Sequence, residues 1–329
     1  MSGRYRAAVC TALTGPDSLC IEERASGALG AGEVRIATHA AGVNFPDLLM
    51  TYGKYQFRPD PPFVPGMEIA GEVIETARDL AGIAIGDRVM AGGKGGGFAT
   101  QMIVPATAIM PLPDAMSYEE GACWRSAATT AWHALHDKAA LLPGEALLVL
   151  GASGGVGMAA VKLGRHMGGL VIGTGSSEAK RNAILAAGAD HALDPAAPDL
   201  AEQVKALTGG KGADVVFDPV GCALSIKATR AIGWGGRFLI VGFASGEILA
   251  FPANHALIKG YSLIGLRAGE ANRRDPGLAQ RTGAALATLA GKGVMRPHIS
   301  RSFPLDQAAR ALHAIEDRSV IGRAIITMP

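Results

Sequence analysis

The chain has 329 residues, with 31 basic and 29 acidic side chains, and its formal net charge is +2. Apolar residues make up 49% and charged residues 18%, which excludes a disordered chain, because enough apolar side chains are present to form a core. The near balance of charge gives no indication of binding to nucleic acid or to an anionic membrane, and the length predicts two domains.

The start of the chain and its cysteines bear on the cellular compartment. The first residues, MSGRYRAAVC, lack the apolar stretch of a secretory signal. The longest run without a charged side chain, residues 95–113, contains prolines, glycines and polar residues that a membrane span does not tolerate. Cys10, Cys20, Cys123 and Cys222 form no CxxC pair, which favours buried thiols over disulfides or a structural zinc site. We therefore expect a soluble, cytoplasmic protein.

Residues 1–124 are predicted to form a β-rich, barrel-like domain. Apolar and polar residues alternate over Val34–Thr38 and Gly71–Glu75, as in half-buried strands, and Gly86–Val89 combines a turn with the start of a strand. Helical periodicity follows over residues 117–138.

From Ala146 onward, short apolar strands alternate with helices. Strands are predicted at Ala146–Leu150, Leu170–Gly173, Ala192–Leu193, Val215–Asp218, Arg237–Gly242 and Ser262–Leu266, and helices at Val156–Met167, Glu178–Ala187, Leu200–Leu207 and Ala223–Ile232. This alternation predicts an α/β fold with a doubly wound, six-stranded parallel sheet. The tail, about 297–329, regains strand character at Ala324–Thr327 and is predicted to fold back onto the first domain.

The strongest local motif is a glycine turn between the first of these strands and its helix. The turn contains Gly154, Gly155, Val156 and Gly157. Glycines without a Cβ allow the backbone to approach a diphosphate, and the helix N-terminus offers free N–H groups and a positive dipole end. Because a buried strand precedes the turn and a helix follows it, the motif predicts binding of a dinucleotide.

The end of the second strand decides between NAD and NADP. An acidic residue there would bind the ribose hydroxyls of NAD, but this chain has Gly175 followed by Ser176 and Ser177. Glu178 comes too late in the sequence and is expected in the first helical turn. Lys180, expected one turn into the helix, could contact a 2′-phosphate, unless it is simply a solvated surface lysine. We therefore expect NADPH.

The glycine turn, Ala40–Asp47 and Val64–Glu72 together resemble the medium-chain dehydrogenase/reductase superfamily, and within it the zinc-free NADPH:quinone oxidoreductases of the zeta-crystallin type. The resemblance covers nearly the whole chain, including Phe243–Gly246 after the fifth strand. It implies a bilobal subunit with a cleft between the lobes, and an assembly that is usually a homodimer or a tetramer, of which we expect the homodimer. The implied domains are a GroES-like catalytic domain at 1–124 and 268–329, and a Rossmann domain at 125–267.

The resemblance also bears on zinc. Zinc alcohol dehydrogenases of this superfamily carry Gly-His-Glu where this chain has Gly66, Met67 and Glu68, and their first cysteine ligand falls at Asn44. A thioether is a poor zinc ligand beside hard donors, so we expect no metal and a structural role for Glu68, paired with an arginine or with backbone.

The resemblance implies several site residues. Asn44 would lie beside the nicotinamide ribose and the substrate, or else only form a turn. Tyr55 matches a tyrosine that donates a proton in related enoyl thioester reductases. The alternative is that Tyr55 lines the cleft and donates no proton. Thr130, Val220, Gly242 and Phe243 match positions that face the cofactor, although Thr130 could equally have a packing role. Arg125 and Arg267 could form a cationic rim for an acidic acceptor, or else be exposed loop arginines.

Three functions follow from these features. Hydride transfer from NADPH to a quinone or an α,β-unsaturated carbonyl compound is the first, because such acceptors are electrophilic without a metal. The second is reduction of an enoyl thioester such as a 2-enoyl-CoA. The third is non-catalytic NADPH binding or a structural, crystallin-like role. The expected partner is a small-molecule substrate, with no nucleic acid or membrane.

Overall fold

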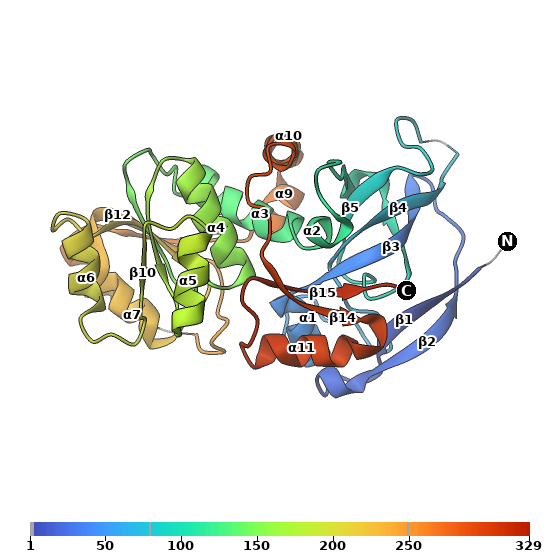
Figure 1. Ribbon diagram of the computed structural model, residues 1–329, viewed down its shortest axis with the longest axis horizontal. Coiled ribbons are helices and arrows are strands. Elements are labelled where there is room, and N and C mark those ends of the chain that lie inside the picture. Colours follow the sequence, from blue (N-terminus) through green and yellow to red (C-terminus); the bar gives the residue numbers. More distant parts are fainter. Residues whose placement is uncertain (1–2, 79, 249) are drawn as a thin grey trace. The chain divides into compact units, whose positions relative to one another are not determined.

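The computed structural model describes residues 3–78, 80–248 and 250–329 of the chain. It separates into two compact units, Met1–Ser126 with Pro297–Pro329, and Ala127–Arg296 (Figure 1). The tail therefore rejoins the first unit at Pro297. The domain boundaries inferred from the resemblance lie at residues 124 and 268, so the two divisions differ over residues 125–126 and 268–296.

The first unit consists mainly of β-structure. Its larger sheet has the order β14-β15-β3-β4-β5-β7 with β6 paired to β3, and a separate sheet joins β1 and β2. The strands are β1 (Arg4–Cys10), β2 (Leu19–Ala25), β3 (Glu33–Val43), β4 (Glu68–Thr76), β5 (Arg88–Gly92), β6 (Gln101–Pro105), β7 (Ile109–Pro111), β14 (Ile299–Pro304) and β15 (Arg323–Thr327). The helices are α1 (Phe45–Thr51), α2 (Tyr118–Ala122) and α11 (Ala308–Glu316), while α3 (Arg125–Trp132) crosses the boundary between the units.

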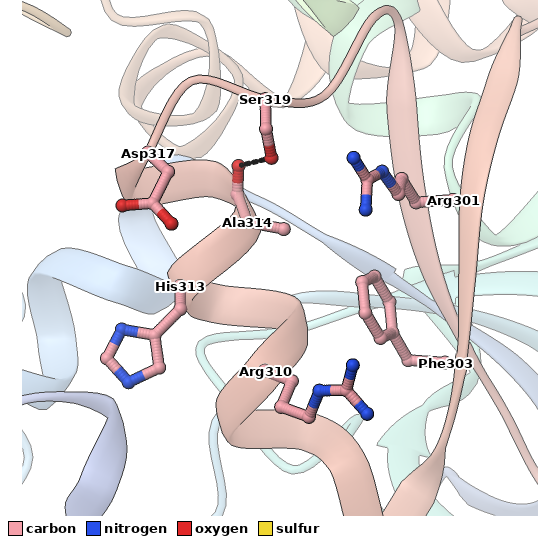
Figure 2. Close-up of a pocket in the computed structure, with 7 residues that line it drawn as sticks. All are labelled: Arg301, Phe303, Arg310, His313, Ala314, Asp317 and Ser319. Carbon is pink, nitrogen blue, oxygen red and sulfur yellow. Dashed lines mark hydrogen bonds between the residues drawn. The ribbon is translucent and has the colours of Figure 1, made fainter.

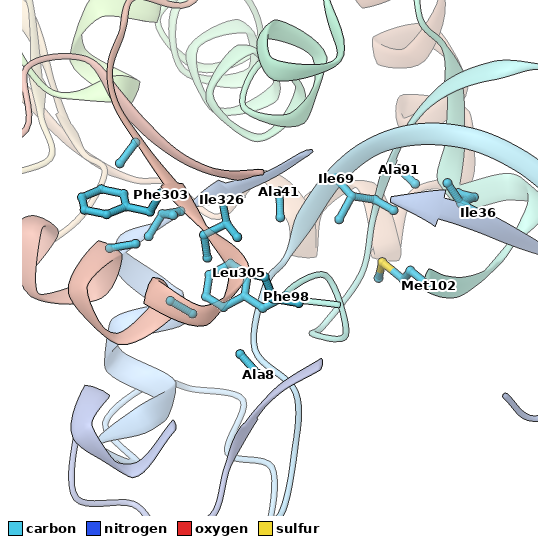
Figure 3. Packing of buried hydrophobic residues seen from close by; sticks show 14 of the residues in the cluster. Ala8, Ile36, Ala41, Ile69, Ala91, Phe98, Met102, Phe303, Leu305 and Ile326 are labelled. Carbon is cyan, nitrogen blue, oxygen red and sulfur yellow. The ribbon is translucent and has the colours of Figure 1, made fainter. Parts of the chain in front are cut away.

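The C-terminal strand completes the core of the first unit. β15 pairs antiparallel with β3, with Ala324 opposite Val43 and Ile326 opposite Ala41, which confirms that the tail folds back. Figure 3 shows Ile326 and Phe303 from the tail packed in one cluster with side chains from the start of the chain. Burial of this apolar area stabilises the pairing, at roughly 25 cal/mol for each Å² removed from water.

The second unit contains one parallel sheet. Its order is β10-β9-β8-β11-β12-β13, and every pair of neighbours is parallel. The strands are β8 (Ala146–Val149), β9 (Leu170–Thr174), β10 (His191–Leu193), β11 (Ala213–Asp218), β12 (Ile232–Ile240) and β13 (Ser262–Gly265). The helices are α4 (Gly155–His166), α5 (Glu178–Ala186), α6 (Leu200–Leu207), α7 (Cys222–Ala231), α8 (Ala253–Lys259), α9 (Ala268–Arg274) and α10 (Pro276–Gly291), with a π-helix at His133–Lys138.

This arrangement confirms the predicted doubly wound, six-stranded sheet. The strand order reverses between β8 and β11, and in such sheets ligands bind outside the carboxyl ends of the strands at this reversal. One predicted boundary is wrong. Ile232 was expected to end a helix, but it begins β12, because its side chain is buried in the sheet core with Phe238.

The four thiols are all free, but they are not all buried. Cys10 and Cys123 are buried as expected, whereas Cys222 is half-buried and Cys20 is exposed.

Within the described ranges, no helix has both the length and the apolar character needed to cross a bilayer.

Candidate functional site

The glycine turn lies at the carboxyl end of β8, as predicted. Gly151 has a φ of 57° and its backbone nitrogen donates to Thr174 Oγ1 over 3.1 Å, which ties the turn to the end of β9. Gly154 is the N-cap of α4 and provides no capping side chain. A Cβ on Gly157 would overlap the carbonyl oxygen of Gly151, so this position must be glycine for helix and strand to pack.

The first turn of α4 therefore begins with backbone N–H groups that no side chain of Gly154 can satisfy. Gly155, Val156 and Gly157 form this turn, and a Cβ on Gly154 would meet the Gly151 oxygen only at 3.5 Å, which leaves the approach open. Together with the positive end of the helix dipole, this geometry fits the diphosphate of a dinucleotide.

The end of β9 brings hydroxyl and basic groups together. Ser177 is the N-cap of α5 and accepts from the backbone nitrogen of Lys180 over 3.3 Å, while the Lys180 ammonium donates to Ser176 Oγ over 3.5 Å. Lys180 thus lies in the first turn of α5, not one turn into it. A Cβ on Gly175 would meet Lys180 Cβ at 3.2 Å, so glycine lets α5 pack close to the strand end.

Arg181 is a basic residue at this corner that sequence reasoning missed. Its guanidinium donates to the Gly175 carbonyl over 3.0 Å and lies 3.6 Å from Asp194. The available signal was its position beside Lys180 in the helix that follows the second strand. Both cations neighbour Gly175, where an acidic residue would stand in an NAD site.

The turns after β11 and β12 meet at the same edge of the sheet. Ser245 N donates to the Val220 carbonyl over 2.9 Å and Gly242 N to the Asp218 carbonyl over 3.3 Å, which places Val220, Gly242 and Phe243 together. A Cβ on Gly151 would lie 2.7 Å from Val220 Cγ2, so these turns also adjoin the glycine turn. The cofactor positions predicted in these turns thus share one edge of the second unit, while Thr130 lies half-buried in α3.

Asp218 organises that edge, and sequence reasoning missed it as well. Its carboxylate accepts from Val220 N at 2.8 Å, from Gly221 N at 3.0 Å and from the Ser225 hydroxyl. Burial raises the pKa of the Asp218 carboxyl, and the three donors oppose that shift. An aspartate that ends a strand directly before Pro-Val-Gly is the signal that could have identified this turn.

In the first unit, Asn44 lies at the centre of a buried polar network. It is the N-cap of α1, and its Nδ2 donates to Glu68 Oε1 over 3.1 Å while its Oδ1 accepts from Arg323 Nη1 over 3.0 Å. Arg323 also forms an ion pair with Glu68, which accepts from Ser126 N over 2.9 Å. Glu68 thus pairs with an arginine and with backbone, as expected.

The structure places the remaining candidates separately. Tyr55 is half-buried in the segment after α1, and its backbone carbonyl accepts from Arg58 Nε over 3.3 Å. Arg125 is not an exposed loop arginine, because it lies in α3 and its guanidinium donates a hydrogen bond to the Ala108 carbonyl. Burial lowers the pKa of this guanidinium. Arg267 is exposed as the N-cap of α9, while Arg273 and Arg274 both bind Glu270.

A shallow cavity of about 240 Å³ lies elsewhere in the first unit, between β14 and α11. Figure 2 shows Phe303 between Arg301 and Arg310, and the Ser319 hydroxyl donating to the Ala314 carbonyl over 3.1 Å. None of the predicted site residues lines it.

In the described residues, no three His, Cys, Asp or Glu side chains gather in a way that could hold a metal ion.

Known proteins resemble this one over nearly the whole chain. Residues 30–114 match the family model of the alcohol dehydrogenase GroES-like domain, and residues 155–281 match that of the zinc-binding dehydrogenases. A quinone oxidoreductase-like protein 2 homolog of Nematostella vectensis is 37% identical over 325 residues, which cover 98% of this chain and 88% of that protein.

Two solved structures show the same fold. A probable oxidoreductase from Mycobacterium abscessus is 34% identical with a TM-score of 0.90, covering 99% of this chain and 100% of that one. The quinone oxidoreductase from Thermus thermophilus, also solved in complex with NADPH, is 31% identical with a TM-score of 0.86, covering 98% of this chain and 99% of that one.

Proposed function

The chain belongs to the quinone oxidoreductase type of the medium-chain dehydrogenase/reductase superfamily, and on this premise we propose an NADPH-dependent reductase of quinones or α,β-unsaturated carbonyl compounds. Membership makes it an oxidoreductase with a nicotinamide cofactor. The observation that carries the choice of NADPH is the corner after β9, where Ser176, Lys180 and Arg181 surround Gly175.

The residues of the second unit divide the binding of NADPH among them. The N–H groups of Gly155, Val156 and Gly157 would bind the diphosphate, and the Lys180 ammonium and Ser176 hydroxyl would bind the 2′-phosphate. The adjoining turns that carry Val220, Gly242 and Phe243 would bound the nicotinamide half. Thr130 would contact the cofactor from α3.

The first unit would supply the acceptor side. When bound, NADPH would supply the hydride that a conjugated carbonyl compound accepts at its β-carbon, with the π electrons moving to the carbonyl oxygen. A proton from the Tyr55 hydroxyl, or from water, would then complete the reduction. A quinone would likewise need one hydride and one proton to become a hydroquinone. Asn44 of this unit would lie beside the reacting groups. The exposed Arg267 belongs to the second unit and would contact an acidic acceptor.

An acceptor screen tests the proposal. NADPH oxidation is followed with 9,10-phenanthrenequinone, 1,4-benzoquinone, a simple enone and crotonyl-CoA. Turnover with quinone or enone supports the proposal, whereas preference for crotonyl-CoA assigns the alternative, an enoyl thioester reductase. Tight NADPH binding without turnover by any acceptor supports a non-catalytic, crystallin-like protein. A preference for NADH over NADPH refutes the cofactor assignment.

The second unit also offers a surface for the proposed homodimer. β13 is an edge strand whose Leu263 is 40% exposed, and Trp234, Leu257 and Ile258 on the adjoining β12 and α8 are 81%, 83% and 66% exposed. An edge strand with unpaired backbone groups beside an apolar patch favours pairing with a second copy of the chain.

A further inference from the structure

The Asn44 amide is held between two groups of opposite charge. Its oxygen accepts from the Arg323 guanidinium at 3.0 Å, and its nitrogen donates to the Glu68 carboxylate at 3.1 Å and to the Gly42 carbonyl at 3.4 Å. A flipped amide would place its NH₂ against a cation and its oxygen against a carboxylate. The two charged neighbours therefore determine which end of the amide is which.

Strand register brings these groups together from distant parts of the chain. Ala324 lies opposite Val43, so Arg323 at the start of β15 lies beside Asn44 at the end of β3. Gly42 lies opposite Glu68 at the start of β4. The C-terminal strand thus contacts the Asn44 side chain through Arg323, from 279 residues away.

Burial makes this arrangement hard to replace. Asn44, Glu68 and Arg323 are 7%, 2% and 6% exposed, so their electrostatic interactions are little screened by water. Arg323 contacts Asn44 through Nη1 and Glu68 through Nη2, a fork that only a planar guanidinium presents. A lysine would keep the charge but could not hold both partners with the same geometry.

We propose that Arg323 is a positioning residue that, together with Glu68, fixes the orientation of the Asn44 amide for contact with the cofactor and acceptor. This inference rests on the proposed function, because it takes Asn44 as the group beside the nicotinamide. Both N–H bonds of the amide are directed at Glu68 and Gly42, so the Asn44 amide has no N–H bond left for a ligand. The hydrogen bond to a developing enolate oxygen must then come from another donor, such as Tyr55.

A double-mutant cycle in the full-length protein tests the positioning role. Arg323→Lys alone lowers kcat/KM for the best acceptor roughly tenfold, mainly through kcat, whereas in an Asn44→Ala background it lowers kcat/KM by less than about twofold. Equal losses in both backgrounds would mean that Arg323 acts independently of Asn44 and would overturn the proposal. Arg237→Lys is the matched control, because Arg237 forms a comparable pair with Glu145 over 2.6 Å in the second unit.

A second measurement does not depend on turnover. The chain has asparagine only at Asn44, Asn182, Asn254 and Asn272, so [¹⁵N]asparagine labelling yields few side-chain NH₂ signals, and Asn44→Ala assigns one of them. Arg323→Lys moves the Asn44 signals and leaves the others in place; unchanged Asn44 signals overturn the proposal. Because this spectrum is recorded without cofactor, it is informative even if the acceptor screen fails.

A charge-neutral variant covers the case in which Arg323→Lys does not fold. Arg323→Gln combined with Glu68→Gln removes both buried charges together and leaves neither unpaired. The Asn44 signals should then lose their distinct positions and broaden as the amide samples both orientations. Retention of sharp, unshifted Asn44 signals in this variant contradicts the proposal.

Discussion

The carboxylate of Asp47 accepts a hydrogen bond from the backbone nitrogen of Gly66 over 3.1 Å, which ties the first turn of α1 to the loop before β4. Its other oxygen accepts from Asn44 N over 2.9 Å and closes a capping box. Asp47 is fully buried, and burial raises the pKa of its carboxyl to about 7, with the nearby Glu68 adding to the shift and the two backbone donors opposing it.

This pKa predicts that the first unit loses stability as pH rises. A folded-state pKa of about 7, above the usual value of 3.8, means that the folded protein holds this proton more tightly than the unfolded chain. The stabilisation that comes from this tighter proton binding is present in full below about pH 4 and is lost between about pH 4 and 7. The loss in the free energy of unfolding is at most on the order of 4 kcal/mol. Urea unfolding should show wild type losing stability relative to Asp47→Asn over this range, because the neutral amide cannot ionise. A difference independent of pH contradicts the prediction, and Asp60→Asn, at an exposed position, serves as the control.

Lys180 should discriminate between the two nicotinamide cofactors. Lys180→Ala removes a cation from the corner after β9, and a charge-assisted hydrogen bond to phosphate contributes roughly 1.5–3 kcal/mol. We expect calorimetry to show a dissociation constant for NADPH raised by about tenfold or more and one for NADH nearly unchanged. Lys211→Ala, at an exposed position, should alter neither. Equal weakening of both cofactors would remove Lys180 from the 2′-phosphate site.

Tyr55→Phe separates proton donation from packing. Loss of the hydroxyl should lower kcat by about 10²-fold or more with an enone, because the enolate left by hydride addition must be protonated. With a quinone the loss should be small, since the anion left by hydride addition can take its one proton from water. The matched control is Tyr52→Phe, whose hydroxyl donates to Glu316 over 2.8 Å and has no assigned part in the reaction. Unchanged rates with every acceptor would exclude Tyr55 as the donor.

The edge of the parallel sheet should control assembly. Leu263→Lys places a charge on β13 within the apolar patch, and we expect it to convert a homodimer into a monomer of 33.7 kDa. Light scattering coupled to size-exclusion chromatography measures the mass directly. Leu142→Lys changes a leucine that is 59% exposed outside this patch and should leave the dimer intact. A Leu263→Lys dimer would place the interface elsewhere.

Much of the second unit could be predicted from the sequence. The six strands, the glycine turn and the helix that starts at Gly155 follow from contiguous patterns, because periodicity and turn chemistry act over a few residues. The start of β12 was harder to predict, since Ile232 is both the C-cap of α7 and the first residue of β12, and no turn residues separate the two elements.

The surroundings of the individual site residues were harder to predict. Asn44 could be singled out in its motif, and an arginine partner for Glu68 could be expected, but which arginine it is depends on the register of a strand at the far end of the chain. Arg125 looked like an exposed side chain because the sequence does not show that its guanidinium reaches the Ala108 carbonyl.

By itself, the sequence determined the two-part organisation, the parallel sheet and the glycine turn before α4, since each is indicated by residues that are neighbours along the chain. Only the tertiary structure decided that Arg323 and Glu68 enclose Asn44, that Asp47 is buried between backbone donors, and that Arg181 joins Lys180 beside Gly175. Such contacts depend on strand register and on how buried charges find partners, and both are settled by the packing of segments that lie far apart in the chain.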